Sequence, residues 1–414
     1  MKENQSFIKV SGSSFTLGGK PVYVCGTNFW YGPYLGSKGK TGDRERLLRE
    51  LDNLKALGIT NLRIMGACED IPSKETMQPA IQAKPGVYDE ELLDGLDFLL
   101  AEMGKRDMHA VIFMNNYWDW TGGMGQYLDW VNGGGPKDPK NNSMLFYSND
   151  KANELFKSTL KNLITRKNSY TGKNYYDDPA IMSWQLANEP RPDYGQGDYK
   201  NGVYLVKWAD ETAKYIHSLD PNHLVSTGSE GLMGSLESEG IYLDEHRSQY
   251  IDYMTMHLWP LNWSWYDPKK PETTYPVTVS KAAAYINTHI GYARMLNKPL
   301  VMEEFGIPRD GGNFQDTVKT TYRDQYYKTL FTLLYDSAAA GSPMAGFNFW
   351  AWGGEARAQH SDGWWKRGDT FTGDPAGEQQ GLNSVFSTDT TTLSIIKETA
   401  GKFKELSERT LTKK

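Results

Sequence analysis

The chain has 414 residues, and its 45 Lys and Arg against 51 Asp and Glu give a net charge of −6. This balance argues against a nucleic-acid or anionic-lipid partner, because both require a basic surface. The absence of an apolar run near 18 residues argues against a membrane-spanning protein. Aromatic residues make up 13%, with 13 Trp and 25 Tyr. They favour either a surface cleft lined by rings or an aromatic-rich core.

Cofactor and metal sites are not expected from the sequence. Cys25 and Cys68 have no CxxC partner and no metal-ligand neighbours, and a disulfide between them stays open. The histidines form no His-x-His pair, and the glycines at 133–135 lack the spacing of a phosphate loop. The first five residues lack the apolar segment of a signal peptide, so we expect any export signal to be absent from this chain or already removed.

Short β-rich runs alternate with amphipathic helical patterns along the whole chain, which is typical of repeated βα units and a parallel sheet. A small hairpin at 7–17, followed by Gly18-Gly19, is expected to cover the bottom of a barrel. Strands are then predicted at 22–28, 61–65, 109–114, 181–186, 224–227, 253–257, 299–303 and 346–350. Helices are predicted at 44–57, 92–106, 152–166, 204–218, 280–296, 322–340 and 395–406. Eight alternations without a linker or repeat predict an α/β protein, a single (β/α)8 barrel domain over residues 1–414.

Three predicted loops are long and rich in Gly, Trp and Asn, at 115–150, 259–276 and 353–381. Loops of this length are usually functional, and in barrels the chemistry lies at the carboxyl ends of the strands. Polar and aromatic residues stand at those ends here: Arg63, Asn115, Asn116, Asn188, Glu189, His257, Glu303, Glu304 and Trp350.

Two of these strand ends carry carboxylates. IMSWQLANEPRP ends a strand at Glu189, whose alternative role is a surface cap of the next helix. PLVMEEFGIPR ends another strand at Glu303 and Glu304; strand alternation predicts that one enters the pocket and that the other pairs toward the helical layer. Carboxylates on strands four and seven of a barrel face each other across its mouth. Glycoside hydrolysis requires such a pair, one acid protonated and one ionised, and a gap of roughly 5 to 5.5 Å means retention.

Five motifs in order, LRIMG, WQLANEPRP, HLWP, VMEEFG and FNFWAWGG, resemble glycoside hydrolase family 5. With the opening GTNFWY, the loop NNYWDWTGG and the segment GSEG, the chain is similar to the endo-β-1,4-mannanases of that family. The resemblance implies a retaining enzyme that cleaves internal β-1,4-mannosidic bonds of mannan, glucomannan or galactomannan by double displacement.

The resemblance also implies roles for the residues at the strand ends. Glu189 would be the acid/base and Glu304 the nucleophile, with Glu303 as a structural partner. Arg63 would lie beside Glu304 and keep it ionised through its fixed positive charge. Asn188 would hydrogen-bond the sugar 2-hydroxyl, a contact that strengthens in the transition state.

Aromatic residues and further polar groups complete the expected substrate-binding set. His257 would position the carboxylates, with a core histidine as the alternative. The family usually has tyrosine where this sequence has Trp259, whose indole donates one hydrogen bond and accepts none. Trp350 would form the floor under the sugar. Other expected contacts are Asn116, Trp118, Trp120, Trp259 and Trp263 along the cleft, where core packing is the alternative for the tryptophans, and Arg191 and Glu230, which could equally be an exposed ion pair.

Two classes of alternative function stay open at this point. The same scaffold serves exo-acting mannosidases and endo-β-1,4-glucanases. A non-catalytic carbohydrate-binding barrel is the alternative of another class, against which both carboxylates and Arg63 argue. We expect β-mannan or manno-oligosaccharides as partners, no nucleic acid and no membrane span, a monomer, and a secreted or periplasmic location that follows from the substrate.

Overall fold

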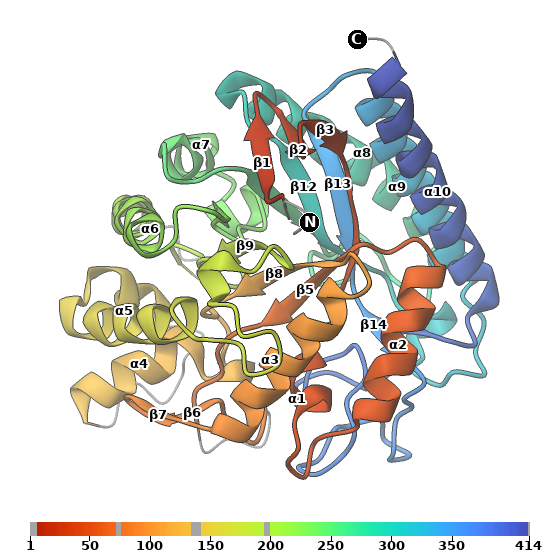
Figure 1. Ribbon diagram of the computed structural model, residues 1–414. Helices are drawn as coiled ribbons and strands as arrows, with labels where there is room; N and C mark the ends of the chain where they lie inside the picture. Colours follow the sequence, from red (N-terminus) through yellow and green to blue (C-terminus); the bar gives the residue numbers. More distant parts are fainter. Residues whose placement is uncertain (1–5, 72–75, 134–141, 194–198, 413–414) are drawn as a thin grey trace. The chain divides into compact units, whose positions relative to one another are not determined.

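An eight-stranded sheet is the centre of the computed structural model, which describes residues 6–71, 76–133, 142–193 and 199–412 (Figure 1). Its strands follow the order β10-β9-β8-β5-β4-β13-β12-β11. The first of these strands in the chain pairs in parallel with the last, with Val24 opposite Gly346, and the sheet forms a near-closed barrel whose end strands are β10 and β11. The fold is the predicted (β/α)8 barrel. The strands are β4 (Val24–Asn28), β5 (Asn61–Met65), β8 (His109–Phe113), β9 (Ile181–Gln185), β10 (Leu224–Ser226), β11 (Met254–Leu258), β12 (Leu300–Phe305) and β13 (Met344–Phe349).

Every predicted strand and helix is present, with shifted ends. Apart from the half-buried His109 at the start of β8, the residues of all eight strands are buried, which explains why the sequence shows the strands as continuous apolar runs. Helix starts are fixed by side-chain caps, as where Asp89 accepts from Glu91 and Leu92 and Asn149 accepts from Ala152. The predicted helices are α2 (Arg44–Ala56), α3 (Glu90–Gly104), α5 (Asp150–Ile164), α6 (Tyr199–Leu219), α8 (Pro271–Leu296), α9 (Thr321–Ala339) and α10 (Thr390–Thr412).

Two of the predicted long loops contain regular structure. The stretch 115–150 holds η1 (Asp119–Thr121), α4 (Gly123–Asn132) and η3 (Ser143–Ser148), while its residues 134–141, with two of the glycines at 133–135, lie outside the described residues. The loop predicted at 259–276 ends early because α8 starts with Pro271 in its first turn and tolerates Pro276 inside the helix. Other elements that the sequence did not indicate are α1 (Gly32–Gly36), α7 (Glu239–Arg247), β6 (Gln82–Lys84), β7 (Val87–Tyr88), β14 (Trp352–Gly354), β15 (Val385–Phe386), η4 (Tyr175–Asp177), η5 (Leu232–Ser235) and η6 (Asp310–Gly312).

The N-terminal hairpin is a three-stranded antiparallel sheet of β1 (Ile8–Ser11), β2 (Ser14–Leu17) and β3 (Lys20–Val22). Gly18 and Gly19 form the second turn with φ of 57° and 78°, a conformation that glycine adopts without strain. Strand β2 contacts β13, and β3 contacts α10.

The chain divides into two compact units, residues 1–8, 31–47 and 64–255 in the first and residues 9–30, 48–63 and 256–414 in the second. The boundaries fall inside β5 and β11, so the first unit contains β8, β9 and β10 and the second contains β4, β12 and β13. Each unit therefore presents its own set of strand ends.

Both cysteines are buried and free, so the possible disulfide is not formed. Burial raises the pKa of the Cys25 and Cys68 thiols to about 12, which keeps them protonated. Among the described helices, none has both the length and the apolar character needed to cross a lipid bilayer.

Candidate active site

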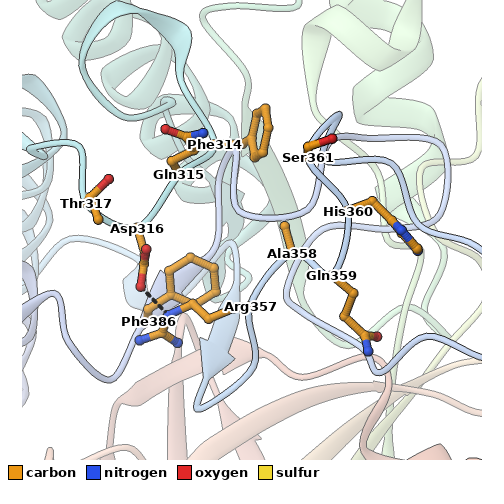
Figure 2. A pocket seen from close by; sticks show the side chains of 10 residues that line it. All are labelled: Phe314, Gln315, Asp316, Thr317, Arg357, Ala358, Gln359, His360, Ser361 and Phe386. Atoms are coloured by element: carbon orange, nitrogen blue, oxygen red, sulfur yellow. Dashed lines mark hydrogen bonds and ion pairs between the residues drawn. The ribbon is translucent and has the colours of Figure 1, made fainter.

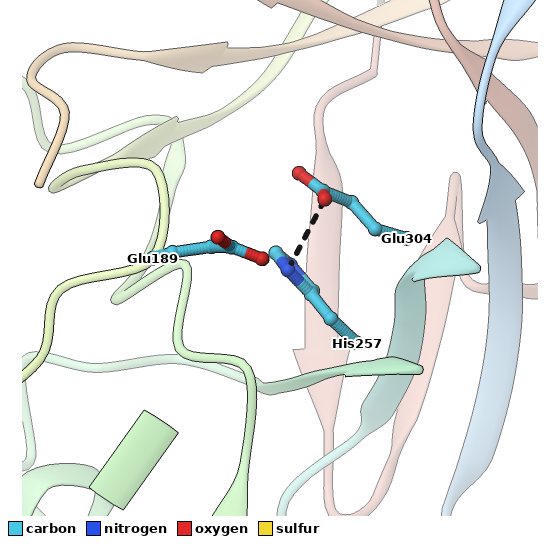
Figure 3. A group of neighbouring side chains, drawn as sticks. All are labelled: Glu189, His257 and Glu304. Carbon is cyan, nitrogen blue, oxygen red and sulfur yellow. Dashed lines mark ion pairs between the residues drawn. The ribbon is translucent and has the colours of Figure 1, made fainter. Parts of the chain in front are cut away.

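Glu304 lies at the end of β12 in the second unit, 3% exposed, and both of its carboxylate oxygens meet donors. Oε1 accepts a short hydrogen bond from Nη1 of Arg63. Oε2 accepts from Nε1 of Trp259 at 3.1 Å, and Nδ1 of His257 lies 3.4 Å from the same oxygen (Figure 3). A buried carboxylate with a guanidinium and an indole donor is stabilised in its ionised form.

Arg63 lies in the middle of β5, is fully buried, and is held in place by a residue of the neighbouring strand. Oδ1 of Asn28, the last residue of β4, accepts from Nη1 of Arg63 at 3.0 Å. The amide nitrogen of Asn28 donates to the carbonyl oxygen of Glu303 at 2.8 Å, which ties β4 to β12. The guanidinium is thereby fixed against Glu304 before any ligand binds.

Glu303 contacts the same arginine as Glu304. Strand alternation predicted that it pairs toward the helical layer; its Oε2 lies 3.8 Å from Nε of Arg63, the guanidinium that also contacts Glu304. A long guanidinium thus reaches two successive carboxylates of one strand. Two negative charges share one positive charge at this strand end.

Trp259 supplies the donor that the family pattern assigns to tyrosine. Its half-buried indole donates to Glu304, and its ring meets the Trp350 ring edge to face, with centroids 5.7 Å apart. Trp350 follows β13, is 5% exposed, and receives a hydrogen bond on its carbonyl oxygen from Tyr327. The substitution of tyrosine by tryptophan therefore keeps a hydrogen-bond donor on the carboxylate.

Glu189 follows β9 in the first unit, 7% exposed, with φ of 51°. A non-glycine residue in this left-handed conformation costs about 1 kcal/mol, and surrounding bonds hold it there. Its backbone N–H donates to the carbonyl oxygen of Gly228, and the preceding Asn188 donates its backbone N–H to Asn115. The amide of Asn188 donates to Oδ1 of Asn116 at 3.1 Å, so the ends of β8 and β9 are joined beyond the sheet.

The carboxylate of Glu189 meets a neutral donor. Nε1 of Trp118 donates to Oε2 of Glu189 at 2.5 Å. The guanidinium of Arg191 lies over the Trp118 ring, 5.0 Å from its centroid, and makes a two-pronged ion pair with Glu230 at 2.5 and 2.7 Å. Burial lowers the pKa of Arg191, but the charge and hydrogen bonds of Glu230 raise it above the ordinary value, so Arg191 stays charged with its charge largely neutralised.

The other residues predicted to contact substrate also make contacts within the protein. Asn116 is buried and accepts from the backbone N–H of Trp118, so it shapes the segment that carries this tryptophan. Trp120 meets Phe113 edge to face. Trp263 packs against Trp265, which precedes α8, and against Tyr285 within α8. Arg191 and Glu230 are an ion pair, but a largely buried one.

Carboxylate, imidazole and thiolate groups are the ligands that a metal ion would need. Within either unit taken alone, the described residues bring no three such groups close enough together to hold an ion.

Comparisons with known proteins identify the family of this chain. Residues 5–408 match the family model of the GH family 5 beta-mannosidase-like proteins. The chain belongs to glycoside hydrolase family 5. It is 34% identical to the glycoside hydrolase family 5 mannosidase from Rhizomucor miehei, with a TM-score of 0.89 over 98% of this chain and 99% of that chain.

Two further family members are named for mannan. A putative mannan endo-1,4-beta-mannosidase 4 of Arabidopsis thaliana is 31% identical over 84% of this chain and 83% of its own length. The endo-beta-1,4-mannanase from Thermotoga petrophila is 27% identical, with a TM-score of 0.68 over 93% of this chain and 77% of that chain. The chain is accordingly a glycoside hydrolase, as the motifs predicted.

Sequence reasoning missed Asn28, although it lies inside the quoted motif GTNFWY. The available signal was its position, a polar residue at the carboxyl end of a fully buried strand next to the strand of Arg63. The same reasoning missed Glu245 of α7, buried at 1% exposure, because nothing in a helical pattern distinguishes an inward glutamate.

Proposed function

We propose that this family 5 hydrolase is a retaining endo-β-1,4-mannanase in which Glu304 is the nucleophile and Glu189 the acid/base. The observation that carries the assignment of roles is the difference between the two carboxylate environments. Glu304 binds a guanidinium and an indole N–H, whereas Glu189 binds an indole N–H beside an arginine that Glu230 already neutralises. Such a difference favours an ionised nucleophile and a carboxyl that can carry a proton.

In the first step an oxygen of Glu304 attacks the anomeric carbon while Glu189 gives its proton to the departing glycosidic oxygen. The mannosyl–oxygen bond breaks and a mannosyl ester of Glu304 forms. In the second step Glu189 takes a proton from water, the water oxygen attacks the anomeric carbon, and the bond to Glu304 breaks. Two inversions give a β-configured product.

Other residues take supporting roles in the proposal. Arg63, fixed by Asn28, and Trp259 receive the negative charge that returns to Glu304 in the second step. His257 orients the same carboxylate. The apolar face of Trp350 would lie against the C–H face of the reacting mannose.

The remaining polar residues would contact the substrate elsewhere. Asn188 is assigned to the 2-hydroxyl, with Asn116 holding its amide. Trp118 and Trp120 are assigned to the aromatic platform along the cleft, and Arg191 and Glu230 to sugar rings beyond the cleaved bond.

A second candidate, an exo-acting β-mannosidase, is favoured by one observation. The Rhizomucor miehei structure with a TM-score of 0.89 is named a mannosidase, whereas the Thermotoga petrophila endo-mannanase has 0.68. Endo and exo enzymes share both catalytic steps and differ in whether the cleft is open at both ends.

Digestion of mannohexaose, with the anomeric configuration followed by proton NMR, tests these points together. The endo proposal predicts early release of di-, tri- and tetrasaccharides with new β ends, and a rapid fall in the viscosity of glucomannan. Release of mannose alone would replace it by the exo candidate. First products of α configuration would contradict the double displacement, and faster cleavage of carboxymethylcellulose would contradict the substrate.

Two properties of the whole molecule extend the proposal. Its substrate is a cell-wall or storage polysaccharide, so the enzyme would act outside the cytoplasm, and fractionation of the producing cells would test this. A polysaccharide cleft needs no second subunit, so we propose a monomer; sedimentation at a mass near 46.8 kDa is the expected result and a dimer mass would contradict it.

A further inference from the structure

A cavity of about 480 Å³ lies in the second unit, formed by residues outside the proposed catalytic set (Figure 2). Two segments line it, one between β12 and α9 and one after β14. Its volume is within the range of sites for small ligands. The lining residues are Phe314, Gln315, Asp316 and Thr317 from the first segment, Arg357, Ala358, Gln359, His360 and Ser361 from the second, and Phe386 of β15.

The cavity is built around one arginine. Nε of Arg357 donates to Asp316 at 2.6 Å, Nη1 donates to the carbonyl oxygens of Gly354 and Ala356, and Nη2 donates to Thr388 at 2.8 Å. Its guanidinium also lies 4.3 Å from the centroid of the Phe386 ring. Four of the five N–H donors are therefore in use, and the charge is paired.

Close contacts at two glycines fix Phe314 of the first segment against the chain that follows the second segment. A Cβ at Gly363, where φ is +78°, would lie 2.9 Å from the ring of Phe314, and one at Gly381 would lie 2.2 Å from the Phe314 carbonyl oxygen. Only glycine permits these approaches. The cavity wall is thus preformed, which lowers the entropy cost of binding a ligand.

The free groups of the lining are neutral donors and acceptors. The side chains of Gln315, Thr317 and Ser361 make no hydrogen bond to any described residue, and all three are exposed. The Phe314 ring adds an apolar surface, and three residues beyond Ser361 stands Trp364, which is 46% exposed and the one tryptophan among the exposed large apolar residues of the described chain.

We propose that this cavity is an accessory carbohydrate site that takes one or two hexose units of a mannan chain. The inference rests on the proposed function for the identity of the sugar. Neutral hydroxyl and amide groups beside aromatic faces fit the hydroxyl edges and C–H faces of a pyranose, and the neutralised Arg357–Asp316 pair offers no net charge to an ionic ligand. The segments that form the cavity follow β12 and β14 in the same chain as Glu304. A polysaccharide bound at such a second site would stay attached to the enzyme between cleavages.

Blocking the cavity tests the proposal. Thr317→Trp fills it from an exposed position, and Phe314→Ala removes its apolar wall. Thr332→Trp is the matched control, the same exchange at an exposed position of α9. Thermal unfolding of each variant identifies any loss of folding.

The expected result is a roughly five- to tenfold rise in KM on soluble glucomannan for Thr317→Trp and Phe314→Ala, with kcat/KM on an aryl β-mannobioside unchanged. Thr332→Trp should behave as the unaltered enzyme on both substrates. Equal KM values for Thr317→Trp and Thr332→Trp on glucomannan would overturn the accessory site, whatever the fate of Phe314→Ala.

Affinity electrophoresis in gels containing glucomannan separates failure of this inference from failure of the proposed function. If the enzyme cleaves neither substrate, the proposed function is refuted. Retardation in the gels then still tests whether the cavity binds glucomannan, independently of catalysis. Stronger retardation of the unaltered chain and of Thr332→Trp than of Thr317→Trp supports the site. Equal retardation, or none, overturns it.

Discussion

Two strand ends of one barrel present a glutamate each, and their surroundings differ in charge. At the end of β12, Glu304 meets a fixed guanidinium and an indole donor, and it shares Arg63 with Glu303. At the end of β9, Glu189 meets one indole donor, while the nearby Arg191 is paired with Glu230. This difference between the surroundings is the basis on which we propose opposite roles for two identical side chains.

The two strand ends also differ in where they place positive charge and in their backbone conformation. The β12 end places the positive charge of Arg63 in direct contact with Glu304. The β9 end places a positive charge nearby but neutralises it, and it holds Glu189 in a left-handed backbone conformation. Substitutions at the β12 end and at the β9 end should therefore differ in their dependence on the leaving group and in the products formed with azide.

The largest effect is expected from Glu304→Ala. Without the nucleophile no mannosyl ester forms, so kcat should fall by at least about 10⁴-fold on mannan and on aryl β-mannosides alike. Azide should restore turnover of an aryl β-mannoside by attacking in place of the carboxylate, which gives the α-mannosyl azide. Retention of mannan hydrolysis by this variant would refute the role of Glu304.

Glu189→Ala should depend on the leaving group. Hydrolysis of mannan, which needs protonation of the departing oxygen, should fall by about 10²- to 10⁴-fold, and an activated aryl mannoside should suffer much less in forming the ester. Azide should now attack the ester of Glu304 and yield the β-mannosyl azide. Equal losses on both substrates, or the α azide, would contradict the acid/base role.

Trp259→Phe isolates the indole donor on Glu304. A hydrogen bond to a carboxylate contributes about 1.5 to 3 kcal/mol, so kcat/KM should fall by roughly 10- to 100-fold. Trp259→Tyr is the matched control, because a phenol also donates, and it should recover most of the activity. The same loss in both variants would show that the ring and not its N–H matters.

Glu245→Gln, in the unit that contains Glu189, is expected to have the smallest effect on activity and to act on the pH dependence of stability instead. Burial raises the pKa of Glu245 to about 8, while the hydroxyls of Thr227 and Ser229 oppose the shift. Since the folded pKa is above the unfolded one, stability is fully present below about pH 4.5 and is lost as the pH rises toward 8.

Urea unfolding at pH 5, 7 and 9 measures that loss. The free energy of unfolding of Glu245→Gln relative to the parent should rise by on the order of 2 to 4 kcal/mol across this range. Glu239→Gln, at an exposed position of the same helix, is the control and should show no such rise. Parallel curves for Glu245→Gln and the parent would exclude a neutral buried acid.

Sequence patterns were sufficient for the barrel because its strands are buried on both faces and stand out as apolar runs. They were insufficient where a local signal was ambiguous. Pro276 resembles a helix breaker but lies inside α8, and the Gly- and Trp-rich stretch after β8 contains α4. In both places tertiary packing overrides local propensity.

For the site, the motifs singled out both glutamates, whose roles stay a proposal, but they did not give the full set of contacts. Asn28, Arg63 and Trp259 converge on Glu304 from three distant segments, and only folding brings them together. The contact of Glu303 with Arg63 was not predicted, because alternation describes the strand and not the reach of an arginine from another strand.

Covalent trapping with 2-deoxy-2-fluoro-β-mannosyl fluoride tests the central claim most directly. The fluorine at C2 slows both steps, and the fluoride leaving group lets the first proceed, so the sugar ester accumulates. Peptide mapping by mass spectrometry should place one 2-fluoromannosyl group on Glu304 in the peptide containing VMEEFG. Attachment to Glu303 or to any other residue, or rapid turnover without a trapped ester, would contradict the assignment.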